Sequence, residues 1–152
     1  MVKPTGPVVS DDPRDAVAQW FARLSRYCAD VDYASARTIF ADDVVSFGTK
    51  AEIVAGLGRL AAEQWQGIWP NITDFRIDLD TVRSGGAGDL AWGVAVWTST
   101  GYDEQHRPFH RPGRATVVLE RRGDGDDRAW LCVHSHFSLN PGTPQKTFGK
   151  RR

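Results

Sequence analysis

The fold is decided by one stretch near the end of the chain, Trp130-Leu131-Cys132-Val133-His134-Ser135-His136-Phe137-Ser138. Its side chains alternate, so we expect a strand with His134 and His136 on one face and Val133, Ser135 and Phe137 on the other. Neither face has the charged character of a surface that only water covers. Such a strand predicts a sheet with both faces covered.

The residues upstream predict three helices. Asp12 and Pro13 supply an N-cap and a first helical residue, and the apolar stripe that follows indicates an amphipathic helix of about 16 residues. Asp32 begins a short second helix that continues through residue 40. Thr49 and Glu52 match a capping box, which predicts a third helix over about 49–64.

From Ile72 onward the spacing of apolar residues changes from helical to alternating, which predicts strands. Strands are expected over residues 44–47, 72–80, 90–100, 113–122 and 129–139. Helices followed by long antiparallel strands are typical of the α+β class. We therefore expect three N-terminal helices packed on one face of a curved antiparallel sheet.

Composition indicates a single domain. The chain has 152 residues, and we expect a flexible N-terminus over 1–11, one domain over 12–142 and a disordered basic tail over 143–152. Nineteen basic residues balance nineteen acidic ones, so neither nucleic acid nor a membrane is expected as a partner.

Cysteine usage and the N-terminal sequence favour a cytoplasmic protein. Cys28 and Cys132 lack metal-type spacing and are expected to be buried, reduced thiols. Residues 1–13 have no apolar run that would form a signal peptide. No stretch reaches the ~20 apolar residues of a membrane span.

Apolar residues on both faces of the strand at 90–100 predict a homodimer. Trp92, Val94 and Val96 oppose Ala95 and Trp97. Helices can cover only one of these faces, and an identical sheet from a second copy is the commonest cover for the other. The expected interface residues are Trp92, Val94, His134 and His136.

Several motifs carry a resemblance to a known superfamily. They are Phe40-Ala41-Asp42-Asp43, Arg107-Pro108, Glu120-Arg121-Arg122, and Trp130-Leu131 with Val133-His134-x-His136-x-Ser138. With this order of elements the chain resembles the nuclear-transport-factor-2-like (NTF2-like) superfamily. Within it the chain is similar to SnoaL-like proteins and to the association domain of calcium/calmodulin-dependent kinase II. The resemblance implies a cone-shaped α+β roll, an open pocket and a homodimer.

The resemblance does not transfer known chemistry. Ketosteroid isomerases share the superfamily, but the position of their catalytic base falls on Gly48 and that of their oxyanion-hole tyrosine falls near Leu24. The pocket arginines of the kinase association domain fall on Trp97, Val117 and Phe137. A pocket that binds small carboxylates there is expected to be apolar here.

The resemblance directs one side of the sheet into the pocket. The expected lining consists of aromatic residues with two hydroxyls: Phe47, Trp65, Trp97, Ser99, Val117, Ser135 and Phe137. Arg111 and Arg114 are expected at its mouth, where they would receive an acidic group or face solvent. The alternative is a filled core without a cavity.

Two functions from different classes follow. The first is a dimeric binding protein that holds a small apolar, aromatic or steroid-like molecule without catalysis. The second is a small isomerase, lyase or hydrolase that uses His136 or a pocket water. His134 and His136 are expected mainly to form hydrogen bonds at the interface. The alternatives are catalysis by His136 and a metal ion held by His134 and His136 together with His106 or His110. No cofactor is expected, because the sequence has no phosphate loop, nucleophile motif or zinc spacing.

Overall fold

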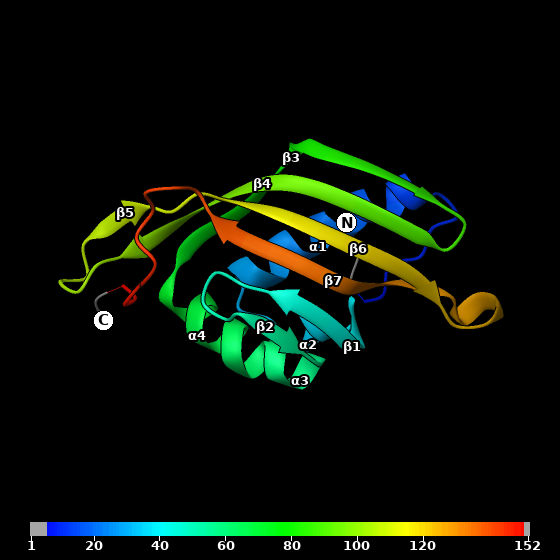
Figure 1. Cartoon of the computed structure of the whole chain (residues 1–152), viewed down its shortest axis with the longest axis horizontal. Helices are drawn as coiled ribbons and strands as arrows, with labels where there is room; N and C mark the ends of the chain where they lie inside the picture. The colour runs from blue at the N-terminus through cyan, green and yellow to red at the C-terminus, as the bar shows by residue number, and fades with distance from the viewer. Residues whose placement is uncertain (1–5, 151–152) are drawn as a thin grey trace.

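A curved sheet of seven strands forms the body of the computed structural model, which describes residues 6–150 (Figure 1). Six strands lie in the order β2-β1-β7-β6-β4-β3, and β5 pairs with β4. The β1–β7 pair is parallel and the other pairs are antiparallel. The strands are β1 (Phe40–Phe47), β2 (Ile53–Ala55), β3 (Thr73–Ala87), β4 (Leu90–Tyr102), β5 (Pro108–His110), β6 (Gly113–Arg122) and β7 (Ala129–Leu139).

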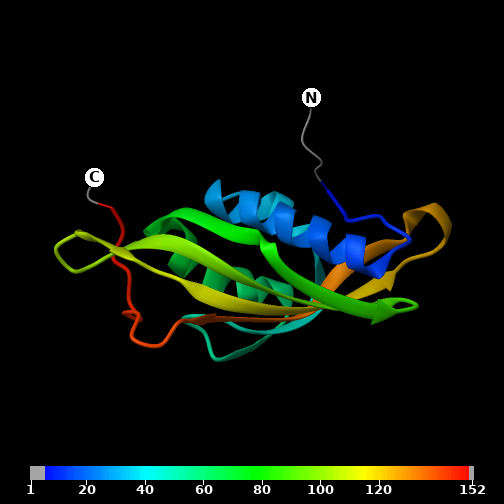
Figure 2. The same ribbon diagram turned by 90° about the horizontal axis from the view of Figure 1, so that it is seen from above.

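The long helix α1 (Pro13–Ala29) covers one face of this sheet. The Asp12 side chain caps it by accepting the backbone N–H of Arg14. The helix packs directly on β4, because a Cβ at Gly93 would lie 2.3 Å from the Val17 side chain. Figure 2 shows no helix on the opposite face within residues 6–150. The predicted α+β class is confirmed.

The second helix is shorter than predicted and the strand after it is longer. Helix α2 (Tyr33–Arg37) is capped by Asp32, and β1 begins at Phe40. The Ile39 carbonyl accepts both the Trp20 indole N–H at 2.7 Å and the Cys132 backbone N–H at 3.0 Å. These tertiary hydrogen bonds direct the chain into the sheet one residue before Phe40. Strand β5 was not among the predicted strands, and it forms by pairing with the end of β4.

The predicted start of the third helix is wrong. Residues 53–55 form β2 against β1, and Gly56 turns the chain with a positive φ of 98°. The helical region follows as α3 (Leu57–Leu60), a π-helical turn η1 (Ala61–Trp65), α4 (Gln66–Ile68) and a 3₁₀ turn η2 (Trp69–Asn71). The capping box fails because the Gln64 carboxamide accepts the backbone N–H groups of Lys50 and Ala51.

Strand β7 does not alternate strictly. Its pairing with β6 shifts between His134 and Cys132, so Val133 is an extra residue in a β-bulge. Cys132 and Ser135 both point inward and are buried as a result. His134 lies on the outer face, where its Nδ1 donates to the Val45 carbonyl at 2.7 Å.

The segments next to both termini are held against the fold. Val8 is completely buried and forms a β-bridge with Trp130. At the other end, Phe148 N–H donates to the Tyr102 carbonyl and the His106 ring bonds to the Gly149 carbonyl. The flexibility expected for 1–11 and the disorder expected for 143–152 stay predictions, and residues 1–5 and 151–152 lie outside the described residues.

No helix between residues 6 and 150 is long and apolar enough to span a membrane.

Candidate functional site

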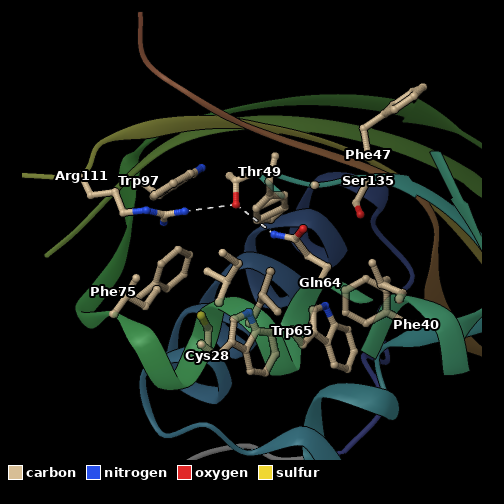
Figure 3. Close-up of a pocket in the computed structure, with 17 residues that line it drawn as sticks. Cys28, Phe40, Phe47, Thr49, Gln64, Trp65, Phe75, Trp97, Arg111 and Ser135 are labelled. Carbon is tan, nitrogen blue, oxygen red and sulfur yellow. Dashed lines mark hydrogen bonds between the residues drawn. The ribbon is translucent and has the colours of Figure 1, made fainter. Parts of the chain in front are cut away.

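The helices and the inner face of the sheet line a small, partly open cavity (Figure 3). Its volume is about 50 Å³, which is room for about three to five water molecules. Most of its wall is apolar: Leu24, Cys28, Phe40, Leu60, Trp65, Ile68, Trp69, Ile72, Phe75, Trp97 and Phe137.

Four polar side chains complete the wall: Thr49, Gln64, Arg111 and Ser135. Gln64 Nε2 donates to Thr49 Oγ1 at 2.9 Å, and Arg111 Nη2 donates to the same oxygen at 3.1 Å. Figure 3 shows these two bonds as a chain across one side of the cavity. The Ser135 hydroxyl is hydrogen-bonded to that of Ser46 at 2.7 Å.

Glycine at position 48 makes room for this network. A Cβ there would lie 2.4 Å from the Gln64 carboxamide. That carboxamide is fixed by its bonds to Lys50, Ala51 and Thr49. A side chain at position 48 would therefore displace a group that stabilises the loop between β1 and β2.

Arg111 is a buried charge without a counter-charge. Its side chain lies over the Trp97 ring, 5.6 Å from the centroid, and the residue is 1% exposed. Desolvation lowers the pKa of the guanidinium from its usual range to about 10, so it remains protonated at neutral pH. Among residues 6–150, no Asp or Glu lines the cavity or forms an ion pair with it.

Within residues 6–150, the cavity wall offers no group that exchanges protons near neutral pH. Its ionisable residues are Arg111 and Cys28. Burial raises the pKa of the Cys28 thiol well above its usual range. The thiol is therefore neutral and a poor nucleophile at pH 7.

The structure brings five of the expected pocket residues to this wall: Phe47, Trp65, Trp97, Ser135 and Phe137. Phe47 borders the cavity, but its ring points away (Figure 3) and contacts His136, 5.1 Å between centroids. Ser99 and Val117 are buried but do not line the cavity. Ser99 Oγ donates instead to the Arg111 carbonyl at 2.9 Å.

The two arginines expected at the mouth lie in different places. Arg111 is inside the wall because its backbone pairs with Ser99, which directs the side chain over Trp97. Arg114 is exposed on the outer face, since it precedes the inward-facing Ala115 on β6. Thr49, Gln64 and Cys28 were not predicted as site residues. One feature of the sequence could have indicated Gln64: it is a polar residue on the apolar side of the predicted third helix, and buried polar groups need hydrogen-bond partners.

The two histidines of β7 do not line the cavity. His136 is exposed on the outer face, and His134 is partly buried there beneath Phe47. Across residues 6–150, no group of three or more His, Cys, Asp or Glu side chains could hold a metal ion.

The curved sheet, the helices on its concave face and the cavity between them define an NTF2-like α+β roll. The chain belongs to the SnoaL-like domain family, whose pattern matches residues 17–141.

Solved structures of low sequence identity share the fold. An NTF2-like superfamily protein from Salmonella enterica has a TM-score of 0.71 at 15% identity, over 86% of this chain and 93% of its own. An NTF2-like protein of unknown function from Pseudomonas putida has a TM-score of 0.68 at 24% identity, over 91% and 95%. A calcium/calmodulin-dependent protein kinase II association domain-like protein from Xanthomonas campestris has a TM-score of 0.65 at 20% identity, over 94% of this chain and 100% of its own. No curated protein matches the chain.

Proposed function

We propose that this protein binds a small molecule in the cavity between the helices and the sheet, does not transform it, and acts as a homodimer. The observation that carries the proposal is the composition of the cavity wall. Apolar and aromatic side chains surround the space, and a few hydrogen-bonding groups converge from one side. This is the usual composition of a small-molecule site.

The size of the cavity limits the ligand. A cavity of about 50 Å³ is smaller than the roughly 150 Å³ that accommodates benzene in an engineered protein core. A steroid-like ligand, which the sequence suggested, does not fit this space. The best fit is a compact molecule with a few non-hydrogen atoms.

The wall favours binding over catalysis. An isomerase of the related type needs a base and an acid inside the cavity. The matched positions, Gly48 and Leu24, both line it and supply neither. His136, the alternative catalytic residue, lies on the outer face. A pocket water would need a base to activate it, and neither Cys28 nor protonated Arg111 serves as one.

The homodimer is supported by the outer face of the sheet. Trp92 is 48% exposed, Val96 is 42% exposed and Phe47 is 40% exposed, and all three lie on this face. Large aromatic and branched side chains on an uncovered sheet favour association with a second copy. An interface of this kind should bury roughly 1,500–2,500 Å² in total.

The test compares two tryptophans of β4. Trp97 lines the cavity, whereas Trp92 lies on the outer face. A panel of compact carboxylates, amides and alcohols is titrated while tryptophan fluorescence and thermal stability are recorded. We expect saturable binding to the wild type, loss of binding in Trp97→Ala and retention in Trp92→Ala.

Two results would contradict the proposal. One is the absence of any saturable binder across the panel. The other is turnover of a bound compound, which NMR of the ligand would detect and which would restore the enzyme hypothesis.

A further inference from the structure

We propose that the cavity recognises a small monocarboxylate, whose oxygens accept hydrogen bonds from Arg111 and from the Thr49 hydroxyl. This inference rests on the proposed small-molecule function and names the ligand class of the same cavity. It follows from three observations: the unpaired guanidinium, the free hydrogen of one hydroxyl, and the dimensions of the apolar space.

Most N–H donors of the Arg111 guanidinium have no hydrogen-bond acceptor within residues 6–150. It carries five N–H groups, and Nη2 alone has a partner, the Thr49 oxygen. Nε has no hydrogen-bond partner anywhere in residues 6–150, and no hydrogen bond from Nη1 occurs there either. Burying a charged group with unused donors is unfavourable unless an opposite charge completes the site. A planar carboxylate matches the geometry of a guanidinium and can accept two of these donors.

The Thr49 hydroxyl supplies a further donor. The Gln64 carbonyl oxygen accepts two backbone N–H groups, so its nitrogen must be the group that faces Thr49. Arg111 can only donate. Thr49 Oγ1 therefore accepts both bonds, and its own hydrogen is left for another acceptor. A ligand oxygen close to Arg111 can take that hydrogen.

The rest of the wall sets the ligand's charge and size. No second cation lines the cavity within the described residues, so one guanidinium meets one negative charge. Apart from these polar groups the wall is apolar, and it includes the rings of Phe75, Trp97 and Phe137. The space for about three to five water-sized groups matches acetate or propionate, with the methyl or ethyl end against the aromatic rings.

The experiment uses the full chain and four probes at pH 7: sodium acetate, sodium propionate, propionamide and sodium chloride. Propionamide matches propionate in shape and lacks its charge, and chloride tests for a general anion site. Binding is followed by tryptophan fluorescence and by the melting temperature. We expect propionate to saturate and to bind about ten-fold or more tightly than propionamide or chloride.

The variants assign the donors. Arg111→Met should lower propionate affinity about ten-fold or more, and Thr49→Val should also weaken it, whereas Thr49→Ser should preserve most of it because the hydroxyl is retained. Arg114→Met is the matched control, since Arg114 is exposed on the outer face. It should bind propionate like the wild type.

The outcomes separate this inference from the function on which it rests. Equal binding of propionamide, equal binding of chloride, or full propionate affinity in Arg111→Met would overturn the carboxylate site. If neutral compounds bind and carboxylates do not, the carboxylate site is wrong and the proposed function stands. If neither class binds, the proposed function is wrong as well.

Discussion

Replacing Arg111 with Met should stabilise the unliganded protein. The fall of the guanidinium pKa from its usual range to about 10 corresponds to about 3 kcal/mol of unfavourable desolvation in the folded state. Methionine has a similar length and no charge, so it fills the same space without the cost of desolvating a charge.

Two favourable contacts are lost in exchange. The hydrogen bond to Thr49 contributes about 1 kcal/mol, and the contact of the guanidinium with the Trp97 ring contributes about 1 kcal/mol. The net expectation is a gain of about 1 kcal/mol in the free energy of unfolding. For a chain of this length that gain raises the melting temperature by about 2–4 °C.

Urea denaturation and calorimetry in a buffer without carboxylates measure this gain. Arg114→Met is the control and should change stability by less than about 0.5 kcal/mol, because Arg114 is exposed. A loss of more than about 2 kcal/mol in Arg111→Met would show that Arg111 is a structural residue. The reasoning that it is a binding residue kept at the expense of stability would then be refuted.

Three further predictions concern pH, the loop and the dimer. The difference in unfolding free energy between Arg111→Met and the wild type should be constant from about pH 6 to 9. Above pH 10 the difference should shrink, because the lowered pKa of about 10 lets folded wild-type protein lose the Arg111 proton before the unfolded chain does. Urea titrations at pH 7 and 10.5 measure the difference, and a larger value at pH 10.5 would contradict this prediction. Gly48→Ala should destabilise the fold by about 1–3 kcal/mol by displacing the Gln64 carboxamide, while Gly58→Ala, whose Cβ meets no atom within 4 Å, should be neutral or stabilising in the same melts. Trp92→Asp should shift the protein from dimer to monomer in sedimentation experiments by placing a charge on the outer face, and a wild type that is monomeric at micromolar concentration would contradict the homodimer.

The sequence predicted the elements with long, regular periodicity. Helix α1 carries its apolar stripe on one side, and its cap at Asp12 is local, so both could be read directly. Strands β4 and β6 alternate over ten residues or more, and they lie close to their predicted ranges. These patterns were enough for the α+β class and for the resemblance to the NTF2-like superfamily.

The predictions that were wrong concern features that depend on contacts between residues distant in the sequence. The capping box at Thr49 was a sound local pattern. However, the backbone N–H groups of Lys50 and Ala51 donate to the side chain of Gln64, which lies fifteen residues after Thr49. The bulge at Val133 arises from the register between β6 and β7, which no local pattern encodes.

The chemistry of the cavity was less accessible still. Arg111 was expected at the mouth of the cavity, and its burial requires both the pairing with Ser99 and the Trp97 ring beneath it. The aromatic residues Trp65, Trp97 and Phe137 could be placed near the cavity because they belong to regular elements. The charged group that distinguishes this cavity could be found only once the fold had brought its neighbours together.

The most direct test of the account is a crystal structure of the protein grown in propionate. We predict one propionate molecule in the cavity, with its carboxylate within hydrogen-bond distance of the Arg111 guanidinium and the Thr49 hydroxyl and its ethyl group against Trp97. A cavity that holds only water at saturating propionate, or one closed by its own side chains, would contradict the account.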